Sequence, residues 1–149
     1  RLSRGLGDVY KRQIVINGKE LHSPLNNLDC GNSGTTTRLV AGLLASQKLT
    51  FSLVGDESLS KRPMKRIITP LTEMGCKISS NDGLLPLSID ASNGISAIDY
   101  DMKVASAQVK SSILFSALGG NNVSSINEII PTRNHSEIML KNMGASIEN

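Results

Sequence analysis

Apolar residues recur along the chain at two different spacings. Over residues 33–45, 63–74, 105–118 and 135–143 they stand three and four positions apart, which is the period of a helix with one buried face. Alternating or short apolar runs predict strands at 49–54, 77–79, 86–90, 97–100, 123–127 and 146–148. Gly75 and Gly144 follow two of the helices, at the left-handed position that commonly ends a helix. The pattern predicts a mixed α/β protein.

The same order of elements occurs twice. Segment 71–78 aligns with segment 140–147, since both begin with Leu and both carry a Met-Gly pair followed by an alternating stretch. Duplication of one α-β-α-β-β unit explains this similarity. We expect the first unit at about residues 14–85 and the second at about 86–149.

Residues 1–13 differ from the rest of the chain. They show neither a helical nor a strand period, and they resemble translated adapter sequence, so we expect a non-native segment, with a native basic arm as the alternative. Five of their residues account for the whole net charge of +3: Arg1, Arg4, Asp8, Lys11 and Arg12. The remainder is neutral overall, which gives no support for a nucleic-acid or membrane partner.

The composition fits one domain with a real core, because 39% of the 149 residues are hydrophobic. No apolar run approaches the roughly 18 residues of a membrane-spanning helix, so we expect a soluble cytoplasmic protein. Cys30 and Cys76 are too few for a disulfide scaffold and lack metal-ligand spacing, which predicts two small core residues and no metal.

Two helix starts are candidates for binding anions. Residues 31–38 form a Gly-rich loop that runs into a helix, where free backbone N–H groups and the helix dipole favour an anion. The segment is not a Walker P-loop, since it lacks the Lys-Ser/Thr pair. Ser106 and Gln108 mark the equivalent helix start in the second unit. Ordinary N-caps, such as Asn32 or Ser33, are the alternative at both places.

Arginines precede the two other helices. Arg62 stands just before the helix at 63–74, and Arg133 just before the helix at 135–143. A cation there opposes the helix dipole, so an anionic ligand explains both positions better than folding does, with solvated loops as the alternative. Lys65 and Arg66 are expected to form a solvated helix face. From the residues alone, the chain is a duplicated α/β protein that binds one or two small anions.

Four segments in order resemble the 5-enolpyruvylshikimate-3-phosphate synthase family. They are 28–38 (LDCGNSGTTTR), 55–64 (GDESLSKRPM), 104–111 (VASAQVKS) and 132–137 (TRNHSE). Thr132 and Asn134 depart from this family, which has Ser and Asp there. The resemblance implies the enolpyruvyltransferase fold, with tandem β-α-β-α-β-β units, of which this chain would hold about two of six.

The resemblance also implies a reaction without a cofactor. The enolpyruvyl group of phosphoenolpyruvate would pass to the 5-hydroxyl of shikimate 3-phosphate, with release of phosphate. The residues implied for phosphoenolpyruvate are Gly34, Arg62, Gln108, Asn32, Thr35 and Arg38. Those implied for shikimate 3-phosphate are Ser106, Ala107, Gln108 and Arg133. Because Gly34 leaves room beside the first substrate, we expect sensitivity to glyphosate-type inhibitors.

No catalytic residue is expected in this chain. The acid and base groups of the family belong to an upstream Gly-x-Lys-Ser-x-x-x-Arg element and to a second domain, so this chain alone is expected to be inactive and the complete protein to be a monomer. The alternatives are a UDP-N-acetylglucosamine enolpyruvyltransferase, a non-catalytic anion-binding module and the remnant of a broken gene. The first would carry a reactive cysteine on a mobile loop, and neither Cys30 nor Cys76 has that context.

Overall fold

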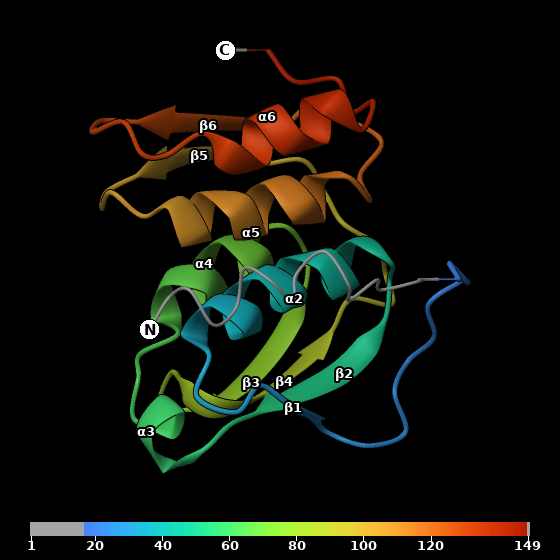
Figure 1. Cartoon of the computed structure of the whole chain (residues 1–149), viewed down its shortest axis with the longest axis vertical. Helices are drawn as coiled ribbons and strands as arrows, with labels where there is room; N and C mark the ends of the chain where they lie inside the picture. Colours follow the sequence, from blue (N-terminus) through green and yellow to red (C-terminus); the bar gives the residue numbers. More distant parts are fainter. Residues whose placement is uncertain (1–16, 149) are drawn as a thin grey trace, which may run out of the picture.

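Two units, each with helices against one face of a sheet, make up the computed structural model, which describes residues 17–148 (Figure 1). The predicted non-native segment 1–13 lies outside the described residues. The elements are β1 (Leu28–Asp29), α2 (Gly34–Ser46), β2 (Thr50–Val54), α3 (Glu57–Ser60), α4 (Lys65–Glu73), β3 (Lys77–Asn81), β4 (Leu84–Asp90), β5 (Asp99–Met102), α5 (Ala107–Ala117), β6 (Ser125–Glu128) and α6 (His135–Asn142). The predicted mixed α/β class and its four main helices are confirmed.

The first unit contains a four-stranded sheet in the order β1-β2-β4-β3. Strands β1 and β2 are parallel, and β4 is antiparallel to both β2 and β3. Side chains alternate along β4, so that Leu85, Leu87 and Ile89 are buried beneath α2 and α4. Since β4 pairs with β2 and β3, the sheet of the first unit extends to Asp90, past the boundary predicted near residue 85.

The second unit contains the parallel pair β5 and β6, with Tyr100 opposite Ile126. The strand predicted at 146–148 is not formed. Its counterpart in the first unit, β3, is held by hydrogen bonds to β4. Within residues 17–148, no strand pairs with the segment 146–148. Strand β1 and helix α3 were not predicted, because two and four residues are too few to show a period.

Helices α2 and α5 join the two units through very close backbone contact. A Cβ atom on Gly42 would lie 2.2 Å from the carbonyl oxygen of Ser112, and one on Gly119 would lie 2.1 Å from that of Ser46. The hydroxyl of Ser116 donates to the carbonyl of Gly42 at 3.2 Å. No larger residue fits at either glycine without movement of a helix.

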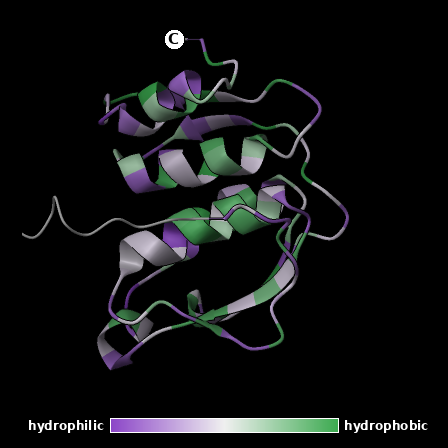
Figure 2. Cartoon of the chain, turned by 45° about the vertical axis from the view of Figure 1, so that its right-hand side comes forward, coloured by the Kyte–Doolittle hydropathy of each residue, from purple (hydrophilic) through white to green (hydrophobic). Residues whose placement is uncertain are grey.

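Apolar side chains fill the space between the helices and the first sheet, as the hydropathy colouring shows (Figure 2). Cys30 and Cys76 belong to this core, as predicted. Gly75 and Gly144 have φ values of +104° and +97° and end α4 and α6, which confirms the predicted helix ends.

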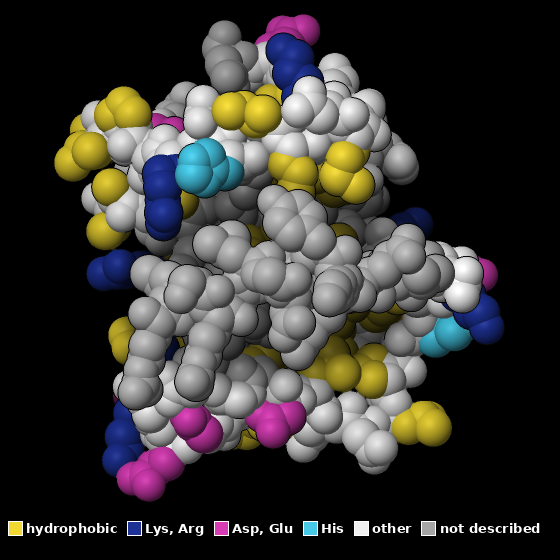
Figure 3. All heavy atoms as spheres, in the orientation of Figure 1, with side chains coloured by type: hydrophobic (Ala, Val, Ile, Leu, Met, Phe, Trp, Pro, Cys, Tyr) yellow, Lys and Arg dark blue, Asp and Glu magenta, His cyan; other side chains and the backbone are white. Residues whose placement is uncertain are grey.

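The surface of the second unit carries more exposed apolar side chains than that of the first unit. Exposed apolar side chains gather on α6 and on the loop before it, in the upper part of Figure 3: Ile129, Ile130, Ile138, Met139 and Met143. No helix within residues 17–148 has the length and apolar character needed to cross a membrane.

Candidate functional site

The helices α2, α4, α5 and α6 all begin on the same side of the molecule, at the left of Figure 1. The Ser33 hydroxyl caps α2 by accepting from the Thr36 amide at 3.1 Å, and the Ser106 hydroxyl caps α5 by accepting from the Val109 amide at 3.4 Å. Several positive ends of helix dipoles therefore face one edge, which favours an anionic ligand there.

A chain of hydrogen bonds crosses from the first unit to the second at this edge. The Nη1 atom of Arg38 donates to Oε1 of Gln108 at 2.9 Å, and Nε2 of Gln108 donates to the Thr35 hydroxyl at 2.8 Å. Both ends of the Gln108 amide are thus engaged by α2, which fixes its orientation. Three predicted site residues from two separate segments, 28–38 and 104–111, lie together.

Arg62 joins the same site from the segment between α3 and α4. Its Nη2 atom donates to Oδ1 of Asn32 at 2.7 Å, and Nδ2 of Asn32 donates to Oδ2 of Asp56 at 2.6 Å. Asp56 also caps α3 by accepting from the Leu59 amide at 2.8 Å. These hydrogen bonds, that of Leu59 first, lower the pKa of Asp56 below its ordinary value, so the carboxylate stays charged.

Gly34 lies between the two guanidinium groups. A Cβ atom on Gly34 would stand 2.7 Å from Nη1 of Arg38 and 3.7 Å from Nη1 of Arg62. Since a real Cβ does not approach another atom to 2.7 Å, a side chain here would displace Arg38. Glycine at position 34 is therefore compatible with the observed position of the Arg38 guanidinium.

Positive charge accumulates at the site. Burial lowers the pKa of Arg38, and the charges of Arg66 and Arg62 lower it further. Among residues 17–148, no salt bridge to a carboxylate involves Arg38 or Arg62. Arg66 is exposed, as predicted, yet it is close enough to affect Arg38. A cluster of guanidinium groups without carboxylate partners suits a polyanion.

The remaining predicted residues lie at the N-termini of α5 and α6. Ser106 and Ala107 are half-buried at the first turn of α5, next to Gln108. Arg133 is exposed in the loop before α6. Within residues 17–148, no hydrogen bond links it to the hydrogen-bonded residues Arg38, Gln108 and Thr35. The structure therefore assembles the residues around Arg38, whereas Arg133 lies on a separate segment, the loop before α6.

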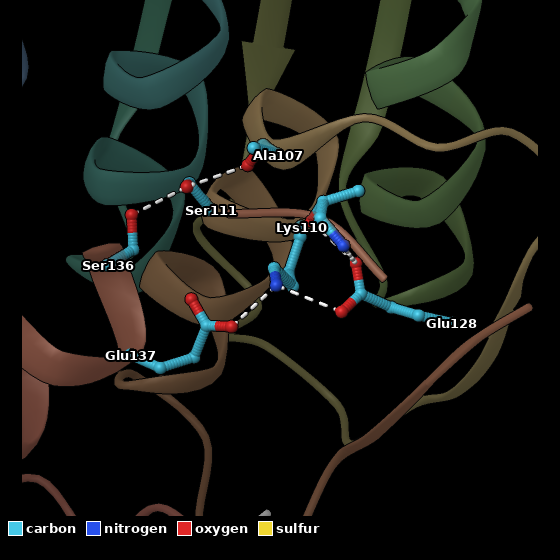
Figure 4. A network of polar contacts seen from close by, with 7 residues as sticks. Ala107, Lys110, Ser111, Glu128, Ser136 and Glu137 are labelled. Carbon is cyan, nitrogen blue, oxygen red and sulfur yellow. Dashed lines mark hydrogen bonds and ion pairs between the residues drawn. The ribbon is translucent and has the colours of Figure 1, made fainter. Parts of the chain in front are cut away.

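Sequence reasoning missed a buried ion-pair network in the second unit (Figure 4). Nζ of Lys110 lies 2.9 Å from Oε2 of Glu128 and 2.5 Å from Oε1 of Glu137. Burial acts to lower the pKa of Lys110, but the two carboxylates outweigh it and the pKa lies above its ordinary value. For Glu128, burial acts to raise the pKa, and the Thr132 hydroxyl and Lys110 together bring it below its ordinary value. The sequence shows only a lysine two positions after Gln108 on an otherwise apolar and small-residue helix, and it does not show that this lysine is buried.

The described residues contain no group of three or more His, Cys, Asp or Glu side chains placed to hold a metal ion. His22 and His135 are both exposed. The chemistry that this site offers is the binding of anions by arginines, helix N-termini and one bridging amide.

The comparisons with known proteins agree with this geometry. Residues 4–149 match the family model of EPSP synthase (3-phosphoshikimate 1-carboxyvinyltransferase), so the match includes most of the segment 1–13. The 3-phosphoshikimate 1-carboxyvinyltransferase of Ruthia magnifica is 53% identical over 135 residues, which are 91% of this chain and 31% of that protein. That of Vesicomyosocius okutanii is 46% identical over 148 residues, which are 99% of this chain and 34% of that protein.

Solved structures give the same result. The EPSP synthase of Acinetobacter baumannii superposes with a TM-score of 0.80 at 43% identity, covering 85% of this chain and 29% of that protein. The chain spans about a third of the length of the curated relatives that it matches. The match favours this family over UDP-N-acetylglucosamine enolpyruvyltransferase. By its sequence motifs, its fold and its similarity to these relatives, the chain belongs to the EPSP synthase family.

Proposed function

We propose that this chain is the substrate-binding part of an enzyme that transfers the enolpyruvyl group of phosphoenolpyruvate to the 5-hydroxyl of shikimate 3-phosphate and releases phosphate. The hydrogen bonds of Gln108 to Arg38 and Thr35 carry the proposal, because they unite two helix N-termini at one positively charged edge. Two polyanionic substrates that react with each other need two adjacent anion sites.

Phosphoenolpyruvate would bind on the side of α2. Arg62 and Arg38 would hold its phosphate and carboxylate groups through charge-assisted hydrogen bonds, since guanidinium groups match both in shape. Gly34 would let the ligand approach the start of α2, and Asn32 and Thr35 would offer further polar contacts. The charge of the ligand would offset the repulsion from Arg66 and Arg62, which lowers the pKa of Arg38 in addition to burial.

Shikimate 3-phosphate would bind on the side of α5. Ser106 and Ala107 would offer a hydroxyl and first-turn amides to its phosphate, and Arg133 would add a guanidinium from the loop before α6. Gln108 would lie between both substrates. Its fixed amide would set the distance between the attacking hydroxyl and the enolpyruvyl carbon, which is a contribution of proximity rather than of proton transfer.

Proton transfer is not assigned to a residue of this chain. We propose that the remainder of the synthase supplies those groups, that the chain alone is inactive, and that the complete protein is a cytoplasmic monomer acting on small molecules. Its size would be checked by light scattering, and a stable dimer would contradict this part of the proposal.

A chimera tests the reaction. Residues 17–148 would replace the equivalent segment of the Acinetobacter baumannii synthase, and phosphate release would be measured with both substrates. We expect an active chimera in which Arg62→Gln raises KM for phosphoenolpyruvate by about tenfold or more, because a charge-assisted hydrogen bond is lost. Lys61→Gln is the matched control, since Lys61 is the neighbouring cation and pairs with Glu57 at 2.6 Å.

The alternatives predict different results in the same assay. Phosphate release with UDP-N-acetylglucosamine in place of shikimate 3-phosphate would favour the related transferase. Binding of both substrates by a chimera that releases no phosphate would favour an anion-binding module. An Arg62→Gln chimera with an unchanged KM for phosphoenolpyruvate would contradict the role of Arg62.

A further inference from the structure

Lys110 forms buried ion pairs with the two residues that flank the segment 129–136 of the second unit. Lys110 is only 4% exposed, and its Nζ atom contacts Glu128 at 2.9 Å and Glu137 at 2.5 Å. Glu128 is the last residue of β6, and Glu137 lies in the first turn of α6. The loop that carries Arg133 runs between these two carboxylates, so one ammonium group of α5 holds both ends of it (Figure 4).

The second oxygen of Glu128 reaches further into this loop. Its Oε1 atom accepts from the Thr132 amide at 3.2 Å and from the Thr132 hydroxyl at 2.5 Å. Thr132 directly precedes Arg133 in the chain. The backbone on the N-terminal side of Arg133 is therefore fixed relative to α5 through two hydrogen bonds and one ion pair.

A second contact joins the start of α6 to the start of α5. The Ser111 and Ser136 hydroxyls lie 2.6 Å apart, and the Ser111 hydroxyl donates to the carbonyl of Ala107 at 2.8 Å. Ala107 is the first residue of α5 and one of the residues assigned to the phosphorylated substrate. Residues on both sides of Arg133 are thus tied to the helix turn that would bind the same substrate.

Packing alone does not account for this arrangement. Two carboxylates and one ammonium leave a net negative charge in the interior, and Oε2 of Glu137 is buried without a hydrogen-bond partner among residues 17–148. A buried ion pair adds little stability compared with apolar side chains of the same size, whereas it demands a defined geometry. Such a network therefore contributes less to stability than to holding the attached groups in defined positions.

We propose that Lys110 and Glu128, acting through Thr132, are positioning residues that place Arg133 against the N-terminus of α5 for binding of shikimate 3-phosphate. This inference rests on the proposed function, because it takes Arg133 to bind that substrate. An exposed arginine on a free loop loses conformational entropy when it binds, and a loop fixed in advance reduces this loss.

Thr132→Val tests the inference without removing a buried charge. Binding of shikimate 3-phosphate to the 149-residue chain would be measured by calorimetry, together with hydrogen exchange at the amides of Thr132 and Arg133. We expect the Kd to rise about fivefold or more and both amides to exchange faster, since the hydrogen bond from the hydroxyl to Glu128 is lost. Thr132→Ser keeps that hydroxyl and is expected to restore the wild-type Kd and exchange.

Thr50→Val is the matched control. The Thr50 hydroxyl also donates to a carboxylate, that of Asp90, at 3.1 Å, but it lies on β2 away from the helix N-termini. We expect its Kd to equal that of the wild-type chain. If Thr132→Val binds as tightly as the wild-type chain, the positioning role is wrong while the proposed function stands. If the wild-type chain does not bind shikimate 3-phosphate, the proposed function fails first, and the positioning role fails with it.

Discussion

Gln108 of α5 accepts a hydrogen bond from Arg38 of α2 at 2.9 Å, although the two residues are 70 positions apart in the chain. The other end of the same amide donates to Thr35 at 2.8 Å. A single side chain of the second unit therefore orients two side chains of the first. This relationship makes Gln108 the residue whose loss affects both halves of the site.

Gln108→Ala is expected to weaken binding of both substrates. The substitution removes a hydrogen bond to a charged group, for which about 1.5–3 kcal/mol is typical, and it frees Arg38 to move. In the active chimera we expect KM to rise at least about tenfold for each substrate. Gln47→Ala, at the C-terminal end of α2, is the control. A rise confined to one substrate would show that Gln108 does not lie between the two.

Gly34→Ala is expected to weaken the binding of both phosphoenolpyruvate and glyphosate. The added Cβ would lie 2.7 Å from Nη1 of Arg38, so the guanidinium has to shift and the space beside it narrows. We expect weaker inhibition by glyphosate and a higher KM for phosphoenolpyruvate in the chimera. Gly18→Ala is the control, because its Cβ would meet no atom within 4 Å. Equal inhibition of the chimera with and without the Gly34→Ala substitution would contradict the steric explanation.

Gly42→Ala is expected to destabilise the fold, against the usual trend for helices. Alanine inside a helix normally stabilises it by about 0.5–1 kcal/mol relative to glycine. Here the Cβ would lie 2.2 Å from the Ser112 carbonyl oxygen, and overpacking of this kind costs about 1–3 kcal/mol. Urea unfolding of the 149-residue chain measures whether Gly42→Ala lowers or raises the free energy of unfolding. A variant more stable than the wild-type chain would show that α2 and α5 are not in backbone contact.

The stability contributed by Glu128 is expected to depend on pH. Its pKa in the folded chain lies below the ordinary value of 4.5, so its stabilising effect is complete above pH 4.5 and is lost as the pH falls through the lower, folded value. The difference in unfolding free energy between the wild-type chain and Glu128→Gln should therefore be larger at pH 7 than at pH 3. Urea titrations at both pH values measure it, with Glu57→Gln, an exposed carboxylate, as the control. If the difference in unfolding free energy is the same at pH 7 and pH 3, the ion pair of Glu128 is not the cause of that difference.

The amphipathic helices and the longer strands β2, β3 and β4 could be predicted, because their periodicity follows from which side chains the core buries. The segment at 146–148 has the same alternation but forms no strand, since a strand depends on a partner and not on its own pattern. The two-residue β1 and the four-residue α3 are equally invisible to periodicity.

The candidate site was predictable in its residue types and not in its contacts. Arg62, Arg38 and Gln108 stand in segments whose composition suggests anion binding. Their meeting depends on how closely α2 approaches α5, which in turn depends on Gly42 and Gly119, two residues without any chemical signature. Lys110 was missed for a related reason, because a lysine on a helix is usually solvated and only the packing of α5 shows that this one is not.

The backbone contact between α2 and α5 also makes the two helices a shared support for the candidate site. Gly42 lies against Ser112 and Gly119 lies against Ser46, so that a side chain at either glycine would meet a backbone carbonyl of the other unit. Relief of that clash would change the spacing between the N-termini of α2 and α5, where the two substrates are proposed to bind. A substitution at either glycine is therefore expected to alter the fit of both substrates without contacting them.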